Sequence, residues 1–166
     1  MGESVTVTVR DGHVQIRPFK QCEQKSLLVL WADCDMTGPD SQPQADIDGC
    51  VSNRWSQLLV AELEASLVGS VMLGHDGNRG WVHYLAVAQH CRCRGIGQQL
   101  MQTAESWMGE RSVDTLEATV RPGNLLVRGF YSRIGYRPSS LDVFVKRLTT
   151  QHSLHPGITN RGSAVC

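Results

Sequence analysis

The residues best suited to chemistry follow a short apolar segment in the middle of the chain. Residues 81–87 have the apolar character of a buried strand, and an arginine- and glycine-rich segment follows at residues 92–98. A helix that begins at Gly95 presents free backbone N–H groups and the positive end of its dipole, and glycine lets a diphosphate approach the main chain. Arg92 and Arg94 add positive charge there. This spacing predicts an anion-binding cradle, although a tight turn that only starts an amphipathic helix would contain the same glycines.

Length and composition favour one globular domain. The 166 residues are 41% hydrophobic and 19% charged, which is ordinary for a chain with a sizeable core. Sixteen Lys and Arg residues balance sixteen Asp and Glu residues, so no bulk positive field would attract nucleic acid or an anionic membrane. A small anionic ligand therefore suits the local arginine cluster better than a duplex does.

Cellular location and redox state also follow from composition. No apolar segment approaches the ~20 residues that cross a bilayer, and the first residues contain no hydrophobic signal core. We therefore expect a cytoplasmic protein with reduced thiols. Cys91 and Cys93 beside His90 resemble half of a zinc site, but no second cluster supplies the missing ligands, so we expect no metal.

Hydrophobic periodicity predicts the elements that position the cradle. Strand patterns occur at residues 13–19, 57–63, 66–73, 81–87, 115–120 and 141–148, and helical patterns at residues 21–35, 43–53, 95–109 and 126–134. The three strands between residues 57 and 87 are expected to be antiparallel. Residues 1–12 form either an accessory strand in a hairpin or a loose leader. Residues 149–166 lack periodicity and are expected to be a disordered tail.

Downstream residues support the cradle interpretation. Asn124 precedes a helical pattern that contains Tyr131, and this combination with the segment at 92–97 resembles the GNAT family of acyl-CoA N-acyltransferases, over roughly residues 14–148. The resemblance implies an α/β GNAT domain at residues 13–148, with a mixed, mostly antiparallel sheet that is splayed at its centre and flanked by helices. Further motifs resemble the bacterial, single-domain YpeA-like branch: Leu30-Trp31, Cys34-Asp35, Gly74-x-Asp76-Gly77-x-Arg79-Gly80 and Tyr84-Leu85-x-Val87.

The resemblance also implies a binding site for acetyl-CoA as co-substrate. In the family, the loop that matches residues 92–97 holds the coenzyme pyrophosphate, and pantetheine hydrogen-bonds to the exposed main chain of the central strand. Residues 85–87 of that strand would serve equally as ordinary core residues, because the main chain does the binding. The implied coenzyme-binding residues are Leu85, Ala86, Val87, Arg92, Cys93, Arg94, Gly95, Ile96, Gly97, Gln98 and Asn124.

Catalytic residues are less well defined. Tyr131 matches a family tyrosine near the coenzyme sulfur, and a phenol with a pKa near ~10 can donate a proton to a departing thiolate, although a tyrosine packed on the sheet edge would have the same spacing. Family members often use a glutamate as base, but Trp81 and Thr119 occupy the corresponding positions. His83 and Glu117 are the candidate substitutes, acting directly or through water.

The implied reaction is direct acetyl transfer to a primary amine of a small molecule or peptide. The acceptor would approach over residues 31–55, where five aspartates either attract a cationic amine or form an ordinary solvated loop: Asp33, Asp35, Asp40, Asp46 and Asp48. A lysine amine with a pKa of ~10.4 pays ~4.6 kcal/mol to be neutral at pH 7, whereas an α-amine near ~7.8 needs only ~1 kcal/mol. A missing glutamate therefore favours weakly basic amines. We expect no nucleic acid or membrane partner, and a homodimer is one assembly open to the chain.

Two other functions compete with catalysis. A non-catalytic coenzyme A-binding sensor or interaction module would explain the absent glutamate. A dinucleotide-binding oxidoreductase would carry its glycine fingerprint after the first strand, with an acidic residue about 20 positions further on. Here the glycines follow the fourth or fifth strand, which disfavours the oxidoreductase.

Overall fold

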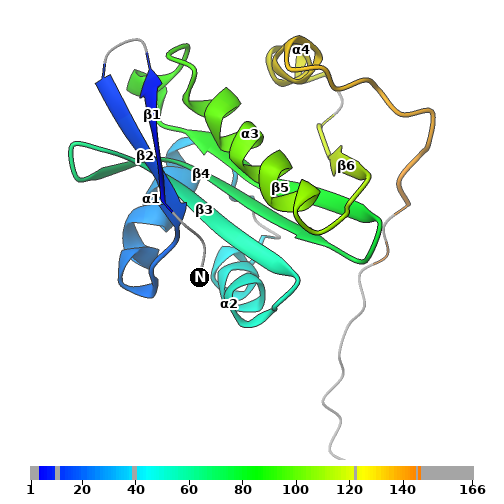
Figure 1. Cartoon of the computed structure of the whole chain (residues 1–166), viewed down its shortest axis with the longest axis horizontal. Helices are drawn as coiled ribbons and strands as arrows, with labels where there is room; N and C mark the ends of the chain where they lie inside the picture. Colours follow the sequence, from blue (N-terminus) through cyan, green and yellow to red (C-terminus); the bar gives the residue numbers. More distant parts are fainter. Residues whose placement is uncertain (1–3, 10–11, 39–40, 122, 145, 147–166) are drawn as a thin grey trace, which may run out of the picture.

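A single sheet organises the chain (Figure 1). The computed structural model describes residues 4–9, 12–38, 41–121, 123–144 and 146. In these residues the strand order is β1-β2-β3-β4-β5-β6, antiparallel except for the parallel pair β5–β6. The predicted α/β class and mixed, mostly antiparallel sheet are confirmed. The strands are β1 (Val5–Val9), β2 (Gly12–Pro18), β3 (Ser56–Leu63), β4 (Ser66–His75), β5 (Arg79–Val87) and β6 (Thr115–Ala118).

Helices cover both faces of the sheet. The first two α-helices pack on one face and the third packs on the other (Figure 1). Each corresponds to a predicted helical pattern, and the helix expected at Gly95 begins one residue later, with Gly95 as its N-cap. The helical elements are η1 (Gln21–Glu23), α1 (Gln24–Asp33), α2 (Pro43–Ser52), η2 (Gln89–Cys91), α3 (Ile96–Gly109) and α4 (Leu125–Arg133).

Strand alternation divides the core between the two faces. Along β3, Leu59 and Ala61 pack in the cluster under α3, whereas Leu58 and Val60 pack in the cluster under α1 and α2. Successive strand side chains point to opposite faces, so a strand covered on both sides is apolar at every position. This two-sided burial explains the unbroken apolar run in β3.

The N-terminal segment is a hairpin strand. β1 pairs with β2 from Val5–Ile16 to Val9–Gly12, which selects the accessory strand over the loose leader among the described residues. Buried Arg17 on β2 then ties the sheet to the start of α1. Its Nε donates to Glu62 Oε2 at 3.0 Å and its Nη1 donates to Glu23 Oε2 at 2.9 Å. Arg17 also holds the pKa of Glu23 below its ordinary value.

The strand predicted at residues 141–148 does not form in its described part. Residues 141–144 and 146 have no regular structure, and the side chains of Leu141, Val143 and Phe144 are exposed. Alternating apolar residues favour a strand only where a neighbouring strand supplies hydrogen bonds and cover. β6 is short and leaves this segment unpaired. The rest of the predicted strand and the tail at 149–166 lie outside the described residues.

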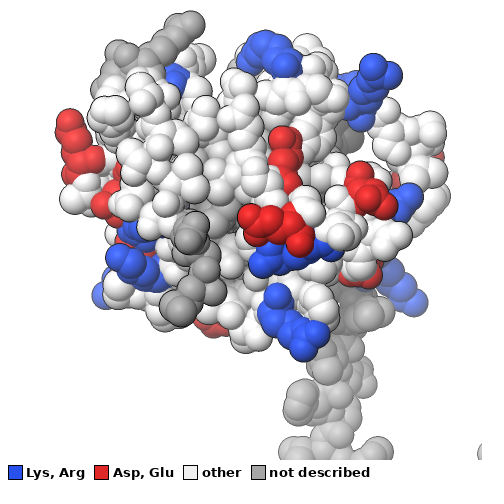
Figure 2. Space-filling model, in the orientation of Figure 1, with Lys and Arg blue, Asp and Glu red and all other residues white. Residues whose placement is uncertain are grey.

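Surface charge agrees with the balanced composition. On the face seen in Figure 2, basic and acidic side chains are interspersed rather than segregated. That face offers no extended patch of one sign for a polyanion. Among the helices that the structure describes, none has the length and apolar character needed to span a bilayer.

Candidate functional site

The glycine-rich loop before α3 has an unusual backbone conformation. Cys93 and Gly95 have φ values of +61° and +95°, and Arg94 between them is not in the positive-φ region. Alternation of this kind is typical of main-chain nests, in which successive backbone N–H groups can bind an anion. Gly95 is the N-cap and has no side chain to satisfy the first turn. The loop conformation is therefore compatible with the predicted cradle, and anion binding by this loop stays a prediction.

Space around the cradle is shaped by its two glycines. A Cβ at Gly95 would meet nothing within 4 Å, so its position is open. A Cβ at Gly97 would lie 3.4 Å from the Phe130 ring on α4 and 3.7 Å from a methyl group of Val87. The first turn of α3 thus lies where the end of β5 and the side of α4 converge.

Arg92 fastens the loop to the end of β5. Its Nε donates to the carbonyl oxygen of Val87 at 3.1 Å, and its Nη2 lies 3.7 Å from the sulfur of Cys34. The Cys34 thiol also donates to the Val87 carbonyl at 3.4 Å. Arg92 therefore holds the loop in position and also adds a positive charge beside it.

Part of β5 is paired with a neighbouring strand on one side only. Its parallel pairing with β6 extends from Arg79–Thr115 to Val82–Ala118 and ends there, whereas its pairing with β4 continues to Val87–Gly69. Within the described residues, residues 83–87 consequently have a strand neighbour on the β4 side only. The splay that was expected at the centre of the sheet therefore lies between the last two of the six described strands, next to the loop before α3.

A β-bulge at the same point redirects the side chains of β5. The register passes from Ser70–Ala86 to Met72–His83, so two β5 residues lie opposite a single β4 residue, and Tyr84 has a φ of +50°. A bulge breaks the alternation of faces. His83 and Tyr84 are neighbours in sequence, yet both line the same pocket.

Three buried polar groups hold the bulge in place. Trp31 Nε1 donates to Ser70 Oγ at 2.8 Å, and the Ser70 hydroxyl donates to the Tyr84 carbonyl oxygen at 3.0 Å. The Trp31 and Tyr84 rings stack with centroids 3.9 Å apart. Sequence reasoning missed this network, because neither the motif that contains Trp31 nor the strand pattern at residues 66–73 indicates that Trp31 and Ser70 meet.

We expect Ser70→Ala to destabilise the protein by about 1–3 kcal/mol, because a buried indole N–H and a buried carbonyl each lose a partner. Chemical denaturation measures the change in the free energy of unfolding. Ser106→Ala is the control, since that exposed hydroxyl donates to Gln102 on the surface of α3 at 3.0 Å. Equal unfolding free energies for the two variants would contradict the role of Ser70.

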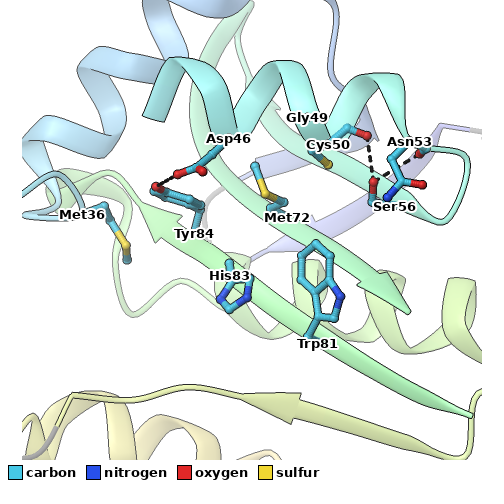
Figure 3. Close-up of a pocket in the computed structure, with 10 residues that line it drawn as sticks. All are labelled: Met36, Asp46, Gly49, Cys50, Asn53, Ser56, Met72, Trp81, His83 and Tyr84. Carbon is cyan, nitrogen blue, oxygen red and sulfur yellow. Dashed lines mark hydrogen bonds between the residues drawn. The ribbon is translucent and has the colours of Figure 1, made fainter. Parts of the chain in front are cut away.

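A pocket of about 580 Å³ lies between α2 and the bulged part of β5 (Figure 3). Asp46 on α2 faces β5, and its Oδ2 accepts a hydrogen bond from the Tyr84 hydroxyl at 2.5 Å. Burial, helped by this hydrogen bond, raises the pKa of Tyr84 well above its ordinary value, so the phenol keeps its proton. The other walls come from β4, β5 and the segment after α1 (Figure 3), and include Met36, Met72, Trp81 and His83.

His83 contributes an imidazole to this pocket. The residue is exposed, but desolvation by the surrounding protein lowers the pKa of its imidazole below the ordinary histidine value. The negative charge of Asp46 raises this pKa, but by less than desolvation lowers it. The imidazole is therefore neutral at pH 7 and able to accept a proton. Its ring centroid lies 4.9 Å from that of Trp81.

Glu117, the other candidate base, lies elsewhere. Its carboxylate accepts a hydrogen bond from Arg79 Nη1 at 2.7 Å on the surface, and Glu117 does not line the pocket. The Glu117 carboxylate is therefore engaged in a surface ion pair away from the pocket. The geometry favours His83 over Glu117.

Tyr131 and Asn124 both belong to α4. Burial raises the pKa of Tyr131 to about 12, so its phenol is protonated at neutral pH. Its ring makes edge contacts with Phe130 and Tyr136, each with centroids 5.3 Å apart. Asn124 is the N-cap of α4, and its Oδ1 accepts from the Val127 N–H at 3.2 Å. Its amide nitrogen is the group left to bind a ligand.

Metal-binding side chains do not gather in the described part of the chain. No three His, Cys, Asp or Glu side chains of these residues lie close enough together to hold a metal ion. Cys91 is buried in the core below α3, whereas Cys93 is exposed in the loop. The two thiols of the half-site considered from the sequence therefore lie in different environments.

Comparison with known proteins agrees with this geometry. The sequence model of the acetyltransferase (GNAT) family matches residues 24–136. The aminoglycoside N-acetyltransferase AAC(6')-Iy in complex with CoA has 15% sequence identity and a TM-score of 0.71, over 85% of this chain and 99% of that chain. A ribosomal-protein-alanine N-acetyltransferase from Brucella melitensis biovar Abortus 2308 has 19% identity and a TM-score of 0.66, over 82% and 99% of the chains. The structural likeness establishes the fold, and the family match spans more than half of the sequence. The protein belongs to the acetyltransferase (GNAT) family.

Proposed function

We propose that the protein transfers an acetyl group from acetyl-CoA directly to a primary amine of a small molecule or peptide. The proposal rests on the positions of the β5 edge, the loop before α3 and the pocket. The one-sided edge of β5 at residues 83–87 leads into the main-chain nest before α3, and the pocket that contains His83 and Asp46 lies beside the same stretch of β5. A donor and an acceptor could therefore meet at the bulge.

The loop and strand would divide the coenzyme between them. Backbone N–H groups of residues 93–98 would hold the pyrophosphate, helped by the dipole of α3 and the charges of Arg92 and Arg94. The main chain of residues 85–87 would pair with the amides of pantetheine, as a partner strand would. An N–H near Val87 would polarise the thioester carbonyl and stabilise its oxyanion. Asn124 would add a donor from the side of α4.

The chemistry requires one proton to leave the amine and one to reach the sulfur. The neutral amine attacks the thioester carbonyl, forming the C–N bond, and the C–S bond then breaks to release the coenzyme thiolate. His83 would accept the proton from the amine, directly or through water, and Tyr131 would donate to the thiolate. The thioester is already activated, so no covalent enzyme intermediate is needed.

Tyr131→Phe should lower kcat about 10- to 100-fold, because a hydrogen bond to a charged group contributes about 1.5–3 kcal/mol. Acetyl-CoA affinity, measured by titration calorimetry, should stay nearly constant. Tyr136→Phe is the matched control, since its hydroxyl donates to Glu105 at 3.0 Å on the neighbouring helix. Equal kcat values for wild type and Tyr131→Phe would remove Tyr131 from this role.

Labelled acetyl-CoA and a mixed amine panel test the overall proposal. We expect acetyl-CoA to bind and the label to appear on at least one amine. Binding with no transfer to any amine would favour the coenzyme A-binding sensor or interaction module instead. The presence of a neutral histidine in a pocket beside the strand edge favours the enzyme.

A further inference from the structure

We propose that the acceptor is a small primary amine with a single positive charge next to an apolar body. This inference rests on the proposed function, because it concerns the pocket in which the acceptor would bind. It follows from three properties of the pocket between α2 and β5: its charge, the nature of its walls and its size.

The pocket supplies one fixed negative charge. Among the described residues that line it, Asp46 is the single carboxylate, and no lysine or arginine accompanies it. Tyr84 donates to one carboxylate oxygen and holds the group in place (Figure 3). The other oxygen remains available to an ammonium group. Of the five aspartates that the sequence placed near the acceptor, Asp40 lies outside the described residues, and Asp33, Asp35 and Asp48 do not line the pocket.

The walls opposite Asp46 are apolar and deformable. Met36 and Met72 reach the pocket with their thioethers, and the Trp81 indole forms the wall beside His83 (Figure 3). Unbranched methionine side chains adapt to apolar ligands, and sulfur contacts aromatic rings favourably. The indole is packed so closely on Gly74 that a Cβ there would lie 2.3 Å from a ring carbon, which gives this wall a firm backing.

The size of the pocket suits a small molecule. Its volume of about 580 Å³ lies within the usual range of about 300–1,000 Å³ for small-ligand sites. On the α2 side, Gly49 leaves open space where any other residue would place a side chain. An apolar body of a few carbons or one ring would fit between α2 and the Trp81 wall.

A polycation fits this pocket poorly. A second ammonium group would meet thioether and indole walls or the neutral Asn53 and Ser56, with no further carboxylate among the described lining residues to replace its hydration. Recognition of a multiply charged amine needs several acidic groups at fixed positions. The pocket charge therefore separates monoamines from diamines and aminoglycosides.

Two matched pairs of amines test the inference without any mutation. Butylamine and 1,4-diaminobutane differ by one ammonium group, and phenethylamine and ethanolamine differ in the apolar body. Release of the coenzyme thiol from acetyl-CoA measures kcat/KM for each amine. We expect butylamine to exceed 1,4-diaminobutane, and phenethylamine to exceed ethanolamine, by at least tenfold. Preference for the diamine, for ethanolamine or for an aminoglycoside would overturn the inference.

Variants of α2 then assign the charge to Asp46. Asp46→Asn should raise KM for butylamine at least tenfold while acetyl-CoA affinity stays unchanged. Asp48→Asn is the control on the same helix, because Asp48 does not line the pocket and accepts a hydrogen bond from Gln24 at 3.4 Å. Equal KM values in the two variants, both verified as folded by thermal denaturation, would overturn the role of Asp46.

The results also separate this inference from the proposed function. Failure to bind acetyl-CoA, or binding without transfer to any amine in a broad panel, would overturn the proposed function itself. Transfer to polyamines, aminoglycosides or peptides, with butylamine and phenethylamine inert, would leave acetyl transfer standing and overturn the acceptor class alone.

Discussion

Gly95→Glu should weaken acetyl-CoA binding by at least a hundredfold. Gly95 lies at the centre of the nest with a φ of +95°, and its open Cβ direction leaves room for a side chain beside the bound anion. A carboxylate about 5 Å from a phosphate charge repels it by roughly 1–3 kcal/mol, depending on the effective dielectric constant. The pyrophosphate carries two such charges, so the loss exceeds what a single surface charge would cause.

Two further variants isolate the charge from other effects. Gly95→Gln has nearly the same size and the same backbone strain but no charge, and it should retain most of the affinity that Gly95→Glu loses. Gly109→Glu adds the same carboxylate at the other end of α3, where a Cβ meets nothing within 4 Å, and should bind normally. Titration calorimetry with acetyl-CoA measures all three. Equal affinity of folded Gly95→Glu and wild type would refute the cradle.

Local sequence was sufficient to predict the loop and helix start at Gly95. The loop conformation depends on Cys93, Gly95 and a helix start, all within a few residues, and the left-handed φ of Gly95 is one that glycine adopts without strain. Helix and strand patterns were equally local, and most were predicted within two residues of their observed ends. Features of this kind follow from residue type and spacing alone.

The bulge and the acceptor pocket depend on contacts between distant residues. Trp31 meets Ser70, and Asp46 meets Tyr84, only because α1 and α2 pack on the same face of the sheet. No periodicity distinguishes Asp46 from the other aspartates of its region. Strand pairing is also non-local, which explains why the alternation at residues 141–144 predicted a strand that finds no partner. Burial and pairing, rather than pattern, decided these positions.

His83→Gln should lower kcat/KM by about 10²–10⁴-fold at neutral pH, the usual contribution of a positioned general base. Glutamine retains a similar size and polarity but cannot accept the proton. His90→Gln is the control, because His90 is exposed in η2 and does not line the pocket. Circular dichroism should show that both variants are folded.

The pH dependence distinguishes a base from a residue that merely shapes the pocket. Ionisation of the amine affects wild type and His83→Gln equally, so it cancels in the ratio of their kcat/KM values. Neutral His83 is the active form and its pKa lies below the ordinary histidine value of about 6.5, so this ratio should be constant above about pH 7.5. As the pH falls below the pKa of His83, the imidazole becomes protonated, and the ratio should fall toward one. A ratio that stays high at a pH where NMR titration shows the His83 imidazole to be protonated would assign His83 a structural role, and the amine would then have to lose its proton to water.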